Sequence, residues 1–521
     1  MWTERSGPPK YRGQNPSVQT TSPGAYMKSI SLILLSAAVM CAPPVHTQPN
    51  QQVRLLVRID NVRLDELVRT GIVKQDNYEP ANLISLVLDT ALVILTPAQR
   101  DTLLGHGLQC TTVLEDPDTL RLIRRAMYGP RFQLEHPFHT YSTLNREIDS
   151  LQKAHPELVR VFTLGTTTAG KLPIRGVKLS RNVKKDDDRP TILFDGCHHS
   201  NEILGAEICL AILRTFVGRD GTDPEITLWL DKFQIYVVPV VNVDGYQVVT
   251  SGTDPRWRKN RRDTNGDGIM DITDGVDINR NYDFNWAHGG SSDPQSERYR
   301  GAYPFSESEN RAFASLARGK HFIASLTYHS EGEVIYYPWT WGGRKAPDDS
   351  LLTSIARDVA RNIVTMKGDT NYRAEYGAGL VGQSYPWLYG TLGTFDFVVE
   401  TGRGASFPPA YLVDGIVRAN LNGVRRFLHR AEGPGVRVRV TDRHTGKPLD
   451  AEVWFPTIET EDIHRRTTRP ESGVCYRLLL PGTYMVIVSA PGYEPLVLRD
   501  VRVDESGWTT IAAALSRSTS R

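Results

Sequence analysis

Two adjacent histidines stand just ahead of a glutamate in the segment FDGCHHSNEILGAE, residues 194–207. Histidine nitrogens and carboxylate oxygens are common protein ligands of zinc. In the first turn of a helix, residues three or four positions apart project from the same side, so either His198 or His199 could share a metal ion with Glu202. A catalytic zinc site also needs a third protein ligand and an open position for water. This segment alone therefore does not establish such a site.

A third possible ligand and three polar partners are found downstream. His329 ends the strand-like stretch of SLTYHSEGEVIYYPW, although a histidine at such a position can equally be a surface or core residue. Arg258 lies in the basic segment PRWRKNRR, and Asn279 and Arg280 lie in GVDINRNYDFNW. A basic cluster is most often a solvated face. A guanidinium group can, however, hold a carboxylate through two parallel hydrogen bonds, and Asn-Arg-Asn after an apolar stretch favours this interpretation.

Six segments, taken together and in this order, resemble the zinc metallocarboxypeptidases of the carboxypeptidase A/B and D/E type, the funnelins. The segments are GCHHSNE, VNVDGY, WRKNRR, GVDINRNY, TYHSEGE and FDFVVETG, and the resemblance extends over residues 137–430. It implies one catalytic zinc ion with three ligands, His199, Glu202 and His329. His198 is then a neighbour that orients the loop.

The resemblance also implies roles around the metal. Arg258 matches the arginine that polarises the scissile carbonyl, and Asn279 and Arg280 match the pair that binds the substrate's terminal carboxylate. Two carboxylates in TFDFVVETG, Asp396 and Glu400, are four residues apart and therefore point to the same face of one strand. An ungapped reading of YPWLYGTLGTFDFVVE against the family ends on Glu400. We therefore expect Glu400 to be the general base and Asp396 to be structural.

Two tyrosines complete the predicted substrate site. Tyr376, in AEYGAG, corresponds to the family's mobile tyrosine, with a spacing that differs by a couple of residues. Tyr385 matches a position deep in the side-chain pocket, where an acidic residue would select lysine or arginine. Tyrosine is not acidic, so the pocket favours a neutral, apolar or aromatic C-terminal residue. An acid elsewhere in the pocket would change this preference.

These roles predict a secreted zinc-dependent exopeptidase that hydrolyses the C-terminal peptide bond of peptides or proteins. Zinc lowers the pKa of its bound water and polarises the carbonyl. Glu400 takes a proton from that water and hands it to the leaving amine, and Arg258 stabilises the oxyanion. Two alternatives stay open. One is a hydrolase of the same fold acting on cell-wall peptides, and the other is a non-catalytic secreted binding protein that works through a C-terminal β-sandwich.

The segment DTNGDGIMDITD, residues 263–274, fits a twelve-residue calcium loop between two substrate-binding elements. Oxygen-bearing side chains occupy five of the usual ligand positions, and Gly268 stands at the sharp turn. A structural calcium ion is predicted there, with an Asp/Gly-rich surface loop as the alternative. The last ligand is Asp274, which is shorter than the usual bidentate glutamate. The candidate ligands are Asp263, Asn265, Asp267, Ile269, Asp271 and Asp274.

The elements that must position these residues indicate an α/β fold. TILFDG is typical of a buried strand and ILGAEICLAILRTF of a helix, so HHSNE lies on a strand-to-helix loop. Strands that are apolar on both faces alternate with helices predicted over 141–159, 203–218 and 350–368. This alternation predicts a mixed, mostly parallel central sheet flanked by helices. Function in such sheets sits beyond the strand ends.

The chain of 521 residues is too long for one ordinary core, and four parts are predicted. Residues 1–48 are a poorly structured N-terminus with a signal peptide from about Met27. Residues 49–128 form a small α/β unit of order β-α-β-α-β, similar in pattern to family pro-domains. The catalytic domain covers 137–430. Short alternating strands over 434–516 indicate an all-β sandwich that resembles a transthyretin-like domain.

The N-terminal segment predicts export. MKSISLILLSAAVMCAPP has the lysine, the short apolar run and the small residues of a secretory signal peptide, and it is too short to span a membrane. A lipid anchor at Cys41 is not expected, because Met40 is bulky. The mature protein is expected to be secreted or periplasmic, to have no stable membrane span and to be a monomer. With a net charge of +2, nothing predicts a nucleic-acid partner.

Overall fold

The computed structural model describes residues 55–518 apart from gaps at 63, 71–74, 77–78, 81–82, 88–89, 115–133, 135–137, 269, 272, 342, 378–380 and 404–407. The predicted signal peptide and Cys41 lie outside the described residues. Within them, no helix combines the length and the apolar character that crossing a membrane requires.

The N-terminal unit contains a four-stranded antiparallel sheet of order β4-β5-β1-β6. The prediction of one strand over LISLVLDTALVILT is wrong, because the chain turns back within it to form a β-hairpin. Helix α3 begins with a capping box in which Thr96 and Gln99 satisfy each other's backbone N–H groups. The elements are β1 (Leu55–Asp60), α2 (Leu64–Arg69), β2 (Gln75–Asp76), β3 (Glu79–Pro80), β4 (Leu83–Val87), β5 (Thr90–Leu95), α3 (Pro97–Gly105) and β6 (Gln109–Leu114).

An eight-stranded sheet of order β15-β12-β16-β11-β9-β10-β8-β7 forms the centre of the next unit. Its four middle strands, β16, β11, β9 and β10, are parallel to one another, whereas β12, β8 and β7 pair antiparallel with their inner neighbours. The mixed sheet with a parallel centre is therefore confirmed. The strands are β7 (Val159–Thr166), β8 (Pro173–Leu179), β9 (Thr191–Gly196), β10 (Gln234–Val238), β11 (Ala324–His329), β12 (Val334–Tyr337), β15 (Arg373–Tyr376) and β16 (Phe395–Glu400).

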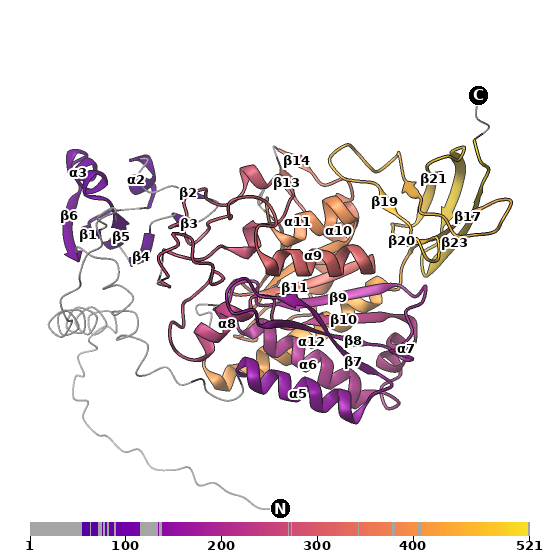
Figure 1. Cartoon of the computed structure of the whole chain (residues 1–521), viewed down its shortest axis with the longest axis horizontal. Coiled ribbons are helices and arrows are strands. Elements are labelled where there is room, and N and C mark those ends of the chain that lie inside the picture. The colour runs from indigo at the N-terminus through magenta and orange to yellow at the C-terminus, as the bar shows by residue number, and fades with distance from the viewer. Residues whose placement is uncertain are drawn as a thin grey trace, which may run out of the picture. The chain divides into compact units, whose positions relative to one another are not determined.

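Helices cover both faces of this sheet, with α9 and α11 on one side and α5 and α6 on the other (Figure 1). The predicted helix over 141–159 ends at Ala154, because a proline at 156 disfavours helical backbone in the residue before it. The predicted helix over 350–368 ends at Ala360. The helices are α5 (Tyr141–Ala154), α6 (Leu204–Arg219), α7 (Pro224–Lys232), α8 (Val243–Thr250), α9 (Ser308–Lys320), α10 (Asp349–Ala360), α11 (Ser384–Leu392) and α12 (Ala410–Ala431).

Two further sheets, β20-β17-β23 and β19-β18-β21-β22, make up the C-terminal part, as predicted for an all-β sandwich. They enclose a core of their own that includes Val438, Phe455 and Val486. The strands are β17 (Gly435–Asp442), β18 (Glu452–Trp454), β19 (Arg466–Thr467), β20 (Val474–Leu478), β21 (Gly482–Ser489), β22 (Leu496–Val503) and β23 (Trp508–Leu515). Its resemblance to transthyretin stays a prediction.

Candidate active site

The register of the sheet brings the predicted catalytic residues to one edge. His329 is the last residue of β11 and pairs directly with Glu400, the last residue of β16. On the other side of β11, Tyr328 pairs with Gly196 at the end of β9. Because these three strands are parallel, their carboxyl ends and the loop after β9 meet at the same place. Residues separated by about two hundred positions in the chain therefore become neighbours.

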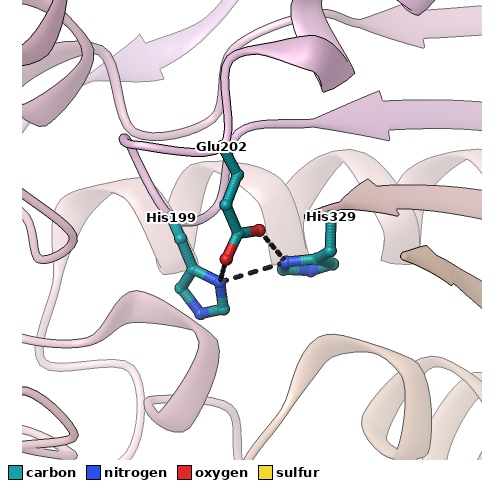
Figure 2. A group of neighbouring side chains, drawn as sticks. All are labelled: His199, Glu202 and His329. Atoms are coloured by element: carbon teal, nitrogen blue, oxygen red, sulfur yellow. Dashed lines mark hydrogen bonds and ion pairs between the residues drawn. The ribbon is translucent and has the colours of Figure 1, made fainter. Parts of the chain in front are cut away.

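His199, Glu202 and His329 point their donor atoms at one another (Figure 2). Nδ1 of His199 lies 2.8 Å from Oε1 of Glu202, and Nδ1 of His329 lies 2.7 Å from Oε2. The two Nδ1 atoms are 3.1 Å apart. All three residues are buried, and among the described residues they are the one group of His, Cys, Asp and Glu side chains assembled closely enough to hold a metal ion.

The loop after β9 decides between the two histidines. The predicted helical turn is wrong here, because α6 begins only at Leu204. Instead, residues 199–202 form a turn in which the Glu202 N–H donates to the His199 carbonyl at 3.2 Å. His198 is fully buried behind this turn, with Nε2 2.8 Å from the hydroxyl of Tyr282. His199, and not His198, therefore stands beside Glu202.

The donor set fits zinc. Ligand atoms held 2.0–2.2 Å from one tetrahedral ion lie roughly 3.3 Å from each other, close to the observed separations. Burial raises the pKa of Glu202, but His199 and His329 lower it further, so the carboxylate is ionised. Burial lowers the pKa of His329 to about 4, which leaves a neutral imidazole with a lone pair to donate. Two imidazoles and one carboxylate match the ligands of catalytic zinc sites.

Asp277 links the metal ligands to the basic residues, a role that was not predicted from the sequence. Its Oδ1 lies 3.3 Å from Nε2 of His199, and its Oδ2 accepts hydrogen bonds from Arg258 at 3.0 and 3.2 Å. It also accepts from the Asn279 N–H at 2.9 Å. A carboxylate behind a ligating histidine fixes the orientation of the ring. The sequence signal that could have indicated this role is the position of Asp277 in the segment GVDINRNY, two residues before Asn279.

The predicted carboxylate-binding pair lies beside the metal ligands. Nδ2 of Asn279 is 3.3 Å from Nε2 of His329. Arg258, which is not a member of this pair, has its Nη2 2.8 Å from Nε2 of His199. Arg280 is 5% exposed and donates to the carbonyl of Asn279 at 2.8 Å. Burial lowers the pKa of Arg280 to about 10, against the opposing charge of Asp277. Arg280 is therefore a buried cation at neutral pH.

Glu400 is the carboxylate that faces this group of residues. It is partly exposed at the end of β16. Burial and the charge of Glu202 raise its pKa well above the ordinary value of a glutamate, and the charges of Arg258 and Arg280 offset this only in part. Both arginines are thus close enough to act on the Glu400 charge.

Asp396 lies deeper in the same strand, about 13 Å from Glu400 at the usual strand rise. It is fully buried and accepts hydrogen bonds from the hydroxyls of Ser325, at 2.7 Å, and Thr327, at 3.2 Å. Burial and the charge of Asp195 raise the pKa of Asp396 to about 8. The structure therefore holds Asp396 inside the sheet rather than at the site.

The two predicted tyrosines are placed differently. Tyr385 is 1% exposed on α11, and the charge of Arg280 acts on its hydroxyl. Tyr376 pairs with Tyr337 on the edge strand β15, whereas Glu400 pairs with Val334. Tyr376 is then two strands and three residues away from Glu400, roughly 14 Å between Cα atoms. Its ring packs against that of Tyr337, with ring centroids 4.8 Å apart and planes inclined by 50°, so this structure does not bring Tyr376 to the candidate metal ligands.

The predicted calcium loop receives no support from the structure. Asp263 accepts hydrogen bonds from the backbone of Gly266 and Gly268, and Asp274 accepts from Thr264 and from the Asp271 N–H. Its aspartates thus satisfy the loop's own backbone. The same pattern is typical of the alternative, an Asp/Gly-rich surface loop. Asn265 and Asp267 contact each other at 3.0 Å, and Ile269 lies outside the described residues.

Comparison with known proteins gives consistent matches. The zinc carboxypeptidase family model matches residues 144–423. Carboxypeptidase B of Astacus astacus is 32% identical over 280 residues, which cover 53% of this chain and 86% of the relative. Carboxypeptidase A1 of Rattus norvegicus is 30% identical over 332 residues, 59% of this chain and 75% of the relative. Among solved structures, carboxypeptidase A of Helicoverpa armigera aligns with a TM-score of 0.53 and 20% identity, over 72% of this chain and 96% of that chain, a likeness of fold.

Proposed function

Because the chain belongs to the zinc carboxypeptidase family, we propose that it removes the C-terminal residue of peptides or proteins through the site at the ends of β9, β11 and β16. One observation carries this proposal. The buried cation Arg280 lies within the same group as the three metal ligands and Glu400, so a terminal carboxylate held by Arg280 directs the adjoining peptide bond to the metal. A binding protein has no need for this combination of a metal triad and a base.

Different residues of the chain have different roles in the proposed reaction. His199, Glu202 and His329 would hold a zinc ion, which when bound would supply a Lewis acid to polarise a carbonyl and acidify water. Glu400 accepts a proton from the attacking water and delivers it to the leaving amine. Arg258 donates hydrogen bonds to the carbonyl oxygen as negative charge develops on it.

Two further residues define where the substrate ends. Arg280 binds the free C-terminal carboxylate through charge-assisted hydrogen bonds, and Asn279 adds an amide donor beside it. Tyr376 keeps its predicted role from the family resemblance, but no step above depends on it. Calcium has no part in the proposal.

The pocket around Tyr385 supports a preference for neutral C-terminal residues. The Tyr385 hydroxyl and the neighbouring Ser384 hydroxyl are buried without a hydrogen-bond partner among the described residues. Within the part of the chain that the structure describes, no carboxylate is hydrogen-bonded to the Tyr385 hydroxyl in a way that could select lysine or arginine. An uncharged aromatic wall favours an apolar or aromatic side chain through burial of its surface.

The proposal is tested with two blocked dipeptides, one ending in phenylalanine and one in lysine. We expect faster release of phenylalanine, loss of release after treatment with a chelator, and recovery when zinc is added back. The released amino acid is measured directly by chromatography. Faster release of lysine would contradict the pocket assignment, and activity that survives complete metal removal would contradict the zinc mechanism.

Export of the protein is part of the proposal and depends on residues 27–48 alone. The apolar run that follows Met27 supports a cleavable signal peptide. N-terminal sequencing of protein recovered outside the cytoplasm tests this, since an N-terminus upstream of residue 27 would contradict cleavage.

A further inference from the structure

A buried cluster of ionic side chains joins the C-terminal sandwich to the catalytic domain. Arg466, Arg477 and Glu459 belong to the sandwich, and Asp348 is the residue just before α10. None of the four is more than 7% exposed. Arg477 contacts Asp348 at 2.8 Å and also pairs with Glu459, and Arg466 contacts Glu459 at 3.0 Å. Buried charges are retained only when they are paired and hydrogen-bonded, so this cluster has a defined geometry.

The same cluster holds the C-terminal end of α11. Nε and Nη2 of Arg466 donate to the carbonyl of Gly393, at 3.2 and 3.0 Å. Gly393 ends α11 in the left-handed conformation, with a φ of 72°, and a Cβ there would lie 2.5 Å from the Arg466 side chain. A cation at the last carbonyls of a helix is also favoured by the helix dipole. Arg466 therefore caps α11 at close range.

A second contact reaches α11 through Asp348. The hydroxyl of Tyr389, on α11, donates to Oδ2 of Asp348 at 2.8 Å, while Arg477 engages Oδ1. In addition, the His464 N–H donates to the carbonyl of Gly390 at 2.7 Å. Three groups from the sandwich thus act on the last turns of one short helix.

The opposite end of α11 belongs to the substrate site. The Ser384 N–H, at the first residue of the helix, donates to Oδ1 of Asn279 at 3.0 Å. Tyr385, the next residue, lines the proposed side-chain pocket. The strand that follows α11 has supports of its own, because β16 is hydrogen-bonded to β11 on one side and β12 on the other. Arg466 lies over the ring of Phe395, 5.2 Å from its centroid, but Phe395 is at the start of β16 and Glu400 at its far end. A shift of α11 would therefore move the pocket and Asn279 but leave Glu400 in place.

We propose that Arg466 and Arg477 are positioning residues for substrate specificity: through Gly393 and through the Asp348–Tyr389 contact, they fix α11 and hence the pocket at Tyr385. This inference rests on the proposed function of that pocket. It assigns the sandwich a role in how tightly the C-terminal residue is held, not in proton transfer. Loss of the contacts should raise KM and leave kcat nearly unchanged.

The test compares Arg466→Ala with Arg469→Ala. Arg469 is a matched control, because it also joins the sandwich to the catalytic domain but donates to the carbonyls of Asp187 and Arg189, away from α11. Using the zinc-loaded enzyme and the blocked dipeptide ending in phenylalanine, we expect Arg466→Ala to raise KM about tenfold, with kcat within about twofold of wild type. Both variants should lower the unfolding temperature, but Arg469→Ala should keep the wild-type KM.

Two further measurements keep the test decisive. Tyr389→Phe removes one hydroxyl with no change of packing, so it should fold and raise KM in the same direction even if Arg466→Ala does not fold. Binding of L-phenylalanine to the zinc-loaded protein, measured by calorimetry, gives a readout without turnover. Equal KM and equal L-phenylalanine affinity in Tyr389→Phe and wild type would overturn the inference. No cleavage by the wild type, together with weaker L-phenylalanine binding by Tyr389→Phe, would contradict the proposed function and still support the positioning role.

Discussion

One buried carboxylate connects the functional residues of the site. Asp277 contacts His199, a proposed zinc ligand, Arg258, the proposed stabiliser of the oxyanion, and the backbone of Asn279. Arg258 and Arg280 lower its pKa, although burial alone would raise it. The proposed metal ligands and the proposed carboxylate-binding residues therefore share one charged partner. A change at Asp277 should affect metal binding and substrate binding together.

Replacement of Asp277 by asparagine tests this connection. We expect zinc affinity to fall about 10- to 100-fold, as is typical when the partner of a ligating histidine is changed. Competition with a fluorescent chelator measures the affinity. Asp283→Asn is the control, because Asp283 lies in the same segment but is exposed. Equal zinc affinity in the two variants would contradict the role of Asp277.

The two carboxylates of β16 are expected to differ in their effect on activity when each is replaced by its amide. Glu400→Gln should lower kcat by roughly 10²- to 10⁴-fold, the usual contribution of a general base, while zinc content stays unchanged. Asp396→Asn should retain most activity, because its pKa of about 8 keeps the wild-type carboxyl protonated at neutral pH, much like an amide. Steady-state kinetics at pH 7 distinguish the two. Loss of activity in Asp396→Asn but not in Glu400→Gln would reverse the assignment.

At the scale of elements, the parallel register of β9, β11 and β16 makes the site. Strand positions were predictable, because these strands are apolar on both faces and bounded by polar loops. The site residues were predictable because each falls at a strand end or in a motif. The pairing of His329 with Glu400 was not, since register is set by contacts between strands far apart in sequence. The pairing of β4 with β5 was missed because the sequence between the two strands contains no glycine or proline.

His139, just before α5, forms ion pairs whose contribution to the stability of the fold depends on pH. Nδ1 of His139 lies 2.8 Å from Glu207 on α6, and Nε2 lies 3.3 Å from Glu147 on α5, which also pairs with Arg214. Hydrogen bonds to Glu147 and Glu207 raise the pKa of His139 to about 9. The folded pKa is above the unfolded value of about 6.5, so this stabilisation is complete below pH 6.5 and is lost as the pH rises through about 9.

The prediction concerns the difference between wild type and His139→Gln. We expect the wild type to be more stable at pH 6 by about 1 kcal/mol, after allowing for the partial exposure of the pair. The difference should shrink toward zero by pH 10. Urea unfolding of both proteins at several pH values measures it. A difference that does not change with pH would show that His139 acts by packing alone.

At the scale of the whole molecule, the sandwich and the catalytic domain share part of one core. Ile463 and Leu478 of the sandwich belong to the same buried cluster as the catalytic helices and strands. The sequence predicted a separate all-β part from its short alternating strands, and each sheet has the expected character. The shared core was not predictable, because it depends on which faces meet rather than on local pattern. Neither were the buried pairs of Arg466 and Arg477, which look like surface charges in the sequence.

The measurement that tests the central claim most directly is hydrolysis of one peptide in two forms, with a free and with an amidated C-terminus, by the wild type and by Arg280→Ala. We predict that the wild-type enzyme cleaves the free form and leaves the amide almost untouched. Arg280→Ala should lose roughly 100-fold in kcat/KM on the free form, because a buried charged partner of the carboxylate is removed. Equal cleavage of both forms by the wild type would contradict an exopeptidase that recognises the terminal carboxylate through Arg280.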